Sequence, residues 1–213
     1  MDWYFIMAKT FADDIEKMSY AMGINVGEYV LKSPLKVNPE LVLEGLKDVL
    51  AGAPGLSPEE YAKAMQELQA KMQQAGQDQM KKAAEGNIKA GTDFLAENKK
   101  KDGVKVTDSG LQYQVITEGS GAKPAKTQKV RVHYTGKLLN GTVFDSSVER
   151  GEPAEFMLNQ VIPGWTEGVQ LMSEGSKYRF FIPAELAYGD RGAGNVIPPG
   201  AALIFDVELL KVL

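Results

Sequence analysis

Hydrophobic residues near the start of the chain recur every three or four positions, which is the spacing of one helical face. In residues 11–31 this repeat is carried by Phe11, Ile15, Met18, Met22 and Val26. Pro34 ends the segment, and Asn38-Pro39 begins a second stretch of helical character that runs to Leu50. The pattern predicts two helices here.

Small residues recur on another face of the first predicted helix, at Ser19, Gly23 and Gly27. An interior glycine costs a helix about 1 kcal/mol relative to alanine, so two of them require an explanation. Close approach of another backbone, as in an intertwined dimer, is one explanation. A weak or broken helix is the other, and the pattern favours neither.

A much longer helix is predicted next. Ser57-Pro58-Glu59-Glu60 supplies an N-cap, a first-turn proline and a capping-box glutamate, and the following proline is Pro124. A helix over 58–100 would be roughly 60 to 65 Å long at 1.5 Å per residue. We expect a rigid spacer with a solvent-exposed middle; the alternative is two helices folded back at Gly76 or Gly86.

From residue 104 the period changes to two, which is typical of strands. Residues 111–115, 130–134 and 178–182 alternate, and one short helix interrupts the strands at 163–169. The fold class is therefore predicted to be α+β, with antiparallel strands over one core. We expect a helical dimerisation region at 1–56, a connecting helix at 57–102 and a sheet domain at 103–213.

The amino-acid composition excludes several classes of catalytic and metal-binding site. The chain has no Cys and a single His, so cysteine nucleophiles, thiolate metal sites and multi-histidine zinc sites are excluded. Alternation places His133 on the side opposite Val132 and Tyr134, away from any site that Tyr134 lines. We expect neither a metal nor a cofactor.

Charge and hydropathy limit which binding partners and which cellular compartment we expect. The net charge of −4 is spread evenly, so we expect no nucleic acid as partner. Residues 1–7 have too short an apolar run for a secretory signal or a membrane span. A cytoplasmic location is the default, and a periplasmic or surface location is the alternative if a signal was removed.

Aromatic residues are frequent at positions that alternation turns inward in the sheet domain. They could line one concave site together with Val161 and Ile162, or simply form the core, as aromatic residues usually do. From pattern alone the core is the simpler reading. The residues are Tyr134, Phe144, Phe156, Trp165, Tyr188 and Phe205.

Six motifs in a fixed order carry a family resemblance. They are Val132-His133-Tyr134-Thr135-Gly136, Gly141-Thr142-Val143-Phe144-Asp145-Ser146-Ser147, Val161-Ile162-Pro163-Gly164-Trp165, Ala187-Tyr188-Gly189, Ile197-Pro198-Pro199 and Phe205-Asp206-Val207-Glu208-Leu209. Together they resemble the FKBP-type peptidyl-prolyl cis-trans isomerases over 107–213. The resemblance implies a bent antiparallel sheet wrapped around a short helix.

The helical half is similar to that of the macrophage infectivity potentiator (Mip) and FkpA subfamily, in which N-terminal helices dimerise and long helices hold two catalytic domains apart. This similarity implies a homodimer through residues 1–56, proline-containing polypeptides as substrates and the family's macrolides as inhibitors. The alternative function is a dimeric holdase chaperone that grips unfolded chains between the long helices.

The resemblance also assigns roles to residues. The proline pocket is formed by Tyr134, Phe144, Phe156, Val161, Ile162, Trp165 and Phe205, with Trp165 as its floor. Ile162 N–H and the Tyr188 hydroxyl are the implied donors to substrate carbonyls, and Ile197 is the implied rim. Asp145 is expected beside the twisting amide, oriented by Tyr134 and paired with Arg150; whether it acts electrostatically or structurally stays open. Residues 190–195 and Leu186 depart from the family pattern at the rim, which leaves the preference for the residue before proline undefined.

Overall fold

The computed structural model describes residues 9–213, which fall into two units that meet between Asp78 and Gln79. The first eight residues lie outside the described part, and with them the start of the predicted dimerisation region and the segment assessed as a signal. Each unit is described by itself below.

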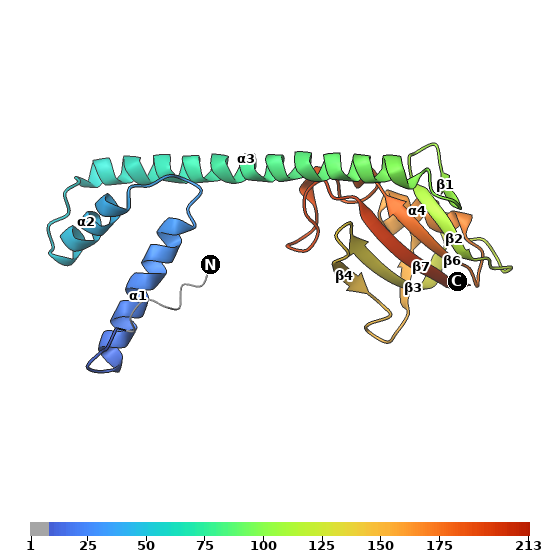
Figure 1. The fold of residues 1–213 in the computed structure, drawn as a ribbon, viewed down its shortest axis with the longest axis horizontal. Coiled ribbons are helices and arrows are strands. Elements are labelled where there is room, and N and C mark those ends of the chain that lie inside the picture. The colour runs from blue at the N-terminus through green and yellow to red at the C-terminus, as the bar shows by residue number, and fades with distance from the viewer. Residues whose placement is uncertain (1–8) are drawn as a thin grey trace. The chain divides into compact units, whose positions relative to one another are not determined.

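The first unit contains α1 (Asp14–Leu31), α2 (Pro39–Leu50) and the N-terminal half of α3 (Pro58–Asn98). Both predicted short helices are therefore present (Figure 1). The first begins at Asp14 rather than at Phe11, because the Asp13 side chain accepts a 2.8 Å hydrogen bond from Glu16 N–H and caps the helix there. Asn38 caps α2 in the same way, with Pro39 in the first turn.

Helices α1 and α2 leave their apolar side chains uncovered. Neither helix, over its described length, buries a residue. Met22 is 72% exposed and Leu31 is 77% exposed, which is unusual for large apolar side chains gathered on two neighbouring helices.

Helix α3 is a single helix of 41 residues. At its start Ser57 and Glu60 form the predicted capping box: Glu60 accepts from Ser57 N–H at 2.9 Å, and Ser57 Oγ accepts from Glu60 N–H at 3.3 Å. The helix runs unbroken through Gly76 and Gly86. The alternative of two helices folded back at one of these glycines is therefore wrong.

The second unit is built on a seven-stranded antiparallel sheet in the order β1-β2-β6-β7-β3-β4 (Figure 1). Strand β5 pairs with β3 on the same side as β4. The strands are β1 (Val104–Val106), β2 (Gln112–Thr117), β3 (Lys129–Leu138), β4 (Val143–Ser146), β5 (Ala154–Met157), β6 (Lys177–Ile182) and β7 (Leu203–Val212). Short 3-10 turns η2 (Leu158–Gln160), η3 (Ala184–Leu186) and η4 (Gly189–Arg191) and helix α4 (Pro163–Leu171) complete the unit.

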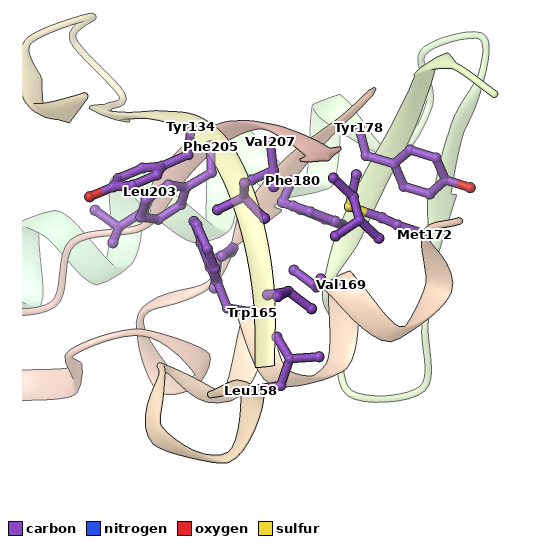
Figure 2. Close-up of a cluster of buried hydrophobic side chains, with 14 of the residues drawn as sticks. Tyr134, Leu158, Trp165, Val169, Met172, Tyr178, Phe180, Leu203, Phe205 and Val207 are labelled. Atoms are coloured by element: carbon purple, nitrogen blue, oxygen red, sulfur yellow. The ribbon is translucent and has the colours of Figure 1, made fainter. Parts of the chain in front are cut away.

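One face of this sheet and α4 enclose the hydrophobic core (Figure 2). Alternate residues of the long strands point into it, such as Val132 of β3, Phe180 of β6 and Val207 of β7, all with 0% exposure. Val169 of α4 meets them from the other side. The predicted α+β class, with a short helix against an antiparallel sheet, is confirmed.

The opposite face of the sheet is partly covered by the C-terminal part of α3. The Phe94 ring lies 5.9 Å from that of Phe181 on β6, and Gln112 Nε2 donates to Leu95 C=O at 2.9 Å. Asn98, 1% exposed, donates to Gln112 Oε1 at 3.0 Å. Residues 79–98 therefore belong to the second unit, a packing that the sequence pattern did not predict.

Candidate active site

A cavity of about 440 Å³ lies in the second unit, where the strands, α4 and the segment around Tyr188 meet. This volume falls within the range of about 300 to 1,000 Å³ that is typical of small-ligand sites. Its lining residues are Tyr134, Phe144, Asp145, Phe156, Gln160, Val161, Ile162, Trp165, Tyr188 and Phe205.

The walls of the cavity are aromatic rings set on edge around Trp165. The rings of Tyr134 and Phe205 each lie 5.3 Å from the Trp165 ring, at interplanar angles of 88° and 82°. Phe156 lies 5.6 Å from it at 85°. Edge-to-face contacts of this kind are favourable and fix ring orientations, so the apolar surface is preformed (Figure 2).

Gly136 on β3 makes room for two of these walls. A Cβ at this position would lie 2.6 Å from the Phe144 ring and 2.7 Å from the Phe205 ring. No side chain larger than hydrogen can stand there without displacing one of them. The small residue at 136 is therefore a requirement of pocket shape.

A polar cluster borders the aromatic walls. The Tyr134 hydroxyl donates to Asp145 Oδ2, Arg150 Nη1 pairs with Asp145 Oδ1, and Arg150 Nη2 donates to the Tyr134 hydroxyl at 3.0 Å. Burial acts to raise the pKa of Asp145, but these hydrogen bonds outweigh it and hold that pKa below its ordinary value. Both carboxylate oxygens are thus already occupied by partners within the chain.

Tyr188 brings a second phenol to the cavity and is 40% exposed. Burial, and after it the negative charge of Asp145, raises the pKa of this hydroxyl above its ordinary value. The group therefore keeps its proton, and hence its capacity to donate, throughout the neutral range.

Ile162 occupies the junction between η2 and α4. Its carbonyl accepts from the N–H groups of Trp165 and Thr166 at 2.9 and 3.0 Å, so its backbone is fixed at the start of the helix. Pro163 follows in the first turn, where its missing N–H costs nothing. This local sequence brings both Ile162 and the Trp165 ring into the cavity lining.

The structure brings together all the predicted site residues except Ile197. That residue is 5% exposed, belongs to the hydrophobic core and does not line the cavity. Gln160 lines the cavity but was not among the predicted residues. Its position directly before Val161-Ile162 is the only sequence signal that could have indicated it.

Other groups lie outside this cavity. His133 Nδ1 is 3.1 Å from Ser147 Oγ, and the imidazole does not reach the aromatic walls. Over residues 9–213 the acidic and histidine side chains form no group of three or more that could hold a metal ion. Among the helices described, none combines the length and apolar character needed to cross a membrane.

Comparison with known proteins agrees with this geometry. Residues 120–210 match the family model described as FKBP-type peptidyl-prolyl cis-trans isomerase. Residues 15–115 match the model described as the domain amino terminal to that isomerase. The two matches between them cover both units.

Named relatives match over nearly the whole chain. FKBP-type peptidyl-prolyl cis-trans isomerase FkpA of Aeromonas hydrophila is 50% identical, over 92% of this chain and 76% of its own. Outer membrane protein MIP of Legionella longbeachae is 42% identical, over 96% and 88%. The crystal structure of FkpA from Escherichia coli has a TM-score of 0.84 at 38% identity, covering 95% of this chain and 98% of that one. The chain belongs to the FKBP-type peptidyl-prolyl cis-trans isomerases.

Proposed function

We propose that the aromatic cavity accelerates X–Pro rotation in polypeptides by excluding water from the twisting amide. Amide resonance sets a barrier of roughly 18 to 20 kcal/mol and makes the planar amide more polar than the twisted one. A preformed apolar wall therefore favours the twisted transition state over the planar ground state. The edge-to-face packing around Trp165 is the observation that carries this proposal.

The polar groups at the border are proposed to hold the substrate chain. Tyr188 donates its hydroxyl to one substrate carbonyl, and Ile162 donates its backbone N–H to another. Asp145 acts structurally: with both oxygens engaged by Tyr134 and Arg150, it orients the Tyr134 wall and makes no contact of its own with the amide.

A peptide assay tests this function. Full-length protein is added to a short peptide with a single X–Pro bond, and cis-to-trans relaxation is followed with and without the macrolide inhibitor of the family. Uncatalysed relaxation takes tens to hundreds of seconds, and we expect the protein to shorten this time. The acceleration should be lost when the macrolide fills the cavity. Acceleration that persists under saturating macrolide would place the activity elsewhere.

We further propose a homodimer through the helices of 9–56. Helix α1 continues unbroken through Gly23 and Gly27, so these residues do not break it. A Cβ at either position would meet nothing within 4 Å, so contacts inside the chain do not explain them. A second copy of α1 packed against the small residues and the exposed apolar face explains both observations.

The same exposed apolar side chains support the alternative function, a holdase that binds unfolded chains. The two activities can be distinguished by the part of the chain that carries each of them. Suppression of aggregation of an unfolding client, measured by light scattering, should survive Trp165→Ala if the helices bind the client. If suppression falls in parallel with peptide isomerisation, the pocket alone is responsible.

Sequence and similarity point to different cellular compartments for this chain. The sequence favours the cytoplasm, with the periplasm or cell surface as the alternative, and the name of the Legionella longbeachae relative supports the alternative. Cell fractionation followed by immunodetection distinguishes them: the chain in the soluble cytoplasmic fraction supports the first, and the chain in the periplasmic or envelope fraction supports the second.

A further inference from the structure

The segment that follows Tyr188 is a loop closed at its base. Gly200 N–H donates to Gly189 C=O at 2.9 Å, directly after Tyr188. Farther out, Ala193 and Ile197 exchange two hydrogen bonds of 2.9 and 3.1 Å. The base of the loop thus directly adjoins Tyr188 in the chain.

Apart from these hydrogen bonds and the buried side chain of Ile197, little within the loop restricts its backbone. Its four glycines, Gly189, Gly192, Gly194 and Gly200, all have positive φ, and such positions lose much conformational entropy on ordering. Pro198 and Pro199 carry no N–H and cannot donate a hydrogen bond. A further anchor at Pro198-Pro199-Gly200 must therefore act on carbonyl groups or press against the backbone.

Helix α3 supplies both kinds of contact within the second unit. Asn87 Nδ2 donates to Pro199 C=O at 2.8 Å. A Cβ at Gly200 would lie 2.5 Å from Ala84 C=O, and a Cβ at Gly91 would lie 3.0 Å from Ala202 Cβ. Helix and loop base are thus in direct backbone contact, with Asn87 as the polar link.

We propose that Asn87 is a positioning residue of the isomerase. By holding Pro199 against α3, it fixes the loop base and thereby the Tyr188 hydroxyl at the border of the cavity. Asn87 touches no substrate and acts through Tyr188, so this inference rests on the donor role proposed above for that hydroxyl. Ala84, Asn87 and Gly91 of the long helix then help to position the site, so the helix is not only a connector.

A double-mutant cycle in the full-length chain tests this role. Asn87→Ala should lower kcat/KM for an X–Pro peptide about threefold to fivefold, because small displacements of catalytic groups are costly and the loss cannot exceed that of the Tyr188 hydroxyl itself. In a Tyr188→Phe background the same change should cost less than about twofold, because the group that it positions is gone. Lys89→Ala is the matched control: its pair with Asp93 is exposed, so kcat/KM should stay unchanged.

A second pair of variants tests the contact without touching the hydrogen bond. Gly91→Ala adds a Cβ against Ala202, whereas a Cβ at Gly86 meets nothing within 4 Å. Both changes favour the helix equally. Gly91→Ala should lower kcat/KM, and Gly86→Ala should not. Circular dichroism melting of each variant confirms that the fold is retained.

The outcomes separate this inference from the proposed role of Tyr188. If Tyr188→Phe lowers kcat/KM but Asn87→Ala does not, or if Asn87→Ala costs the same in both backgrounds, Asn87 does not position Tyr188 and the inference fails alone. If Tyr188→Phe has no effect, the donor role fails and this inference fails with it.

Discussion

Helix α1 and strand β7 both carry regularly spaced apolar residues, yet they end in opposite environments. Leu209 of β7 has 0% exposure in the core of the second unit, whereas Leu31 of α1 is 77% exposed. Regular spacing of apolar residues therefore does not determine what covers the apolar face of an element. The second unit contains the elements that cover its own apolar face, whereas nothing within the described part of the first unit covers the apolar face of α1. The proposed dimer would supply that cover.

The largest effect should come from the floor of the pocket. Trp165→Ala removes the ring around which Tyr134, Phe156 and Phe205 are packed, so unfolding in urea should show a loss of about 3 to 5 kcal/mol. Isomerisation of an X–Pro peptide should fall by about a hundredfold or more. Met22→Ala in α1 is the comparison, and its peptide activity should equal that of the unaltered chain. An active Trp165→Ala protein would mean that the aromatic floor does not determine catalysis.

Removal of the C-terminal part of α3 tests whether residues 79–98 stabilise the second unit. A chain of residues 104–213 lacks the cover of Phe181 and Gln112, and should be about 2 to 3 kcal/mol less stable than a chain of 79–213, roughly the burial of one large apolar side chain. Chemical denaturation of the two truncated proteins measures this difference. Equal stability would show that α3 packs on the sheet without stabilising it.

The dimer should respond to charge on the exposed face of α1. Met22→Glu places a carboxylate where the proposed partner helix packs, which costs about 2 kcal/mol or more if the group is buried. Sedimentation at micromolar concentration should then show a monomer, while peptide isomerisation is unchanged. Lys32→Glu, at the end of the helix, serves as the charge control. A dimer that persists in Met22→Glu would place the interface elsewhere.

A smaller effect is expected at the cavity border. Tyr188→Phe removes one neutral hydrogen bond to substrate, worth about 1 kcal/mol, so kcat/KM should fall about fivefold. Stability should not change, since the ring is retained. If kcat/KM falls and the unfolding midpoint falls with it, the loss of activity reflects a damaged fold, which contradicts the donor role.

The smallest effect should be that of pH. The pKa of Asp145 lies below its ordinary value of 3.8, so the carboxylate is charged at every pH above that value. The pKa of Tyr188 lies above its ordinary value of 10.0, so the phenol is protonated at every pH below that value. We therefore expect a flat kcat/KM between about pH 5 and 9. Any stability that Asp145 contributes is lost only as the pH falls through its lowered pKa. A bell-shaped profile near neutrality would indicate a titrating group outside this pair.

The parts of the fold that the sequence predicted are those set by local chemistry. The capping box at Ser57 and the alternation around Tyr134 each identify their element without knowledge of the rest of the chain. The motifs of the resemblance likewise predicted nearly the whole cavity lining. Gln160 and the core position of Ile197 were missed because each depends on how a turn packs, which short motifs do not encode.

The docking of α3 was missed for a related reason. Asn87 and Asn98 look like ordinary polar residues of a solvent-exposed helix, and each donates to an acceptor outside that helix, Pro199 C=O and Gln112 Oε1. Polar contacts of this kind leave no periodic signal. They are found only when the backbone of both partners is known.

The sheet has short outer strands: β1 has three residues, and β4 and β5 have four each. Open strand edges are templates on which extended polypeptides add themselves by backbone pairing. An enzyme whose substrates are flexible chains meets such polypeptides continually. Edges as short as these offer few unpaired backbone groups to such polypeptides, which limits their addition to the sheet.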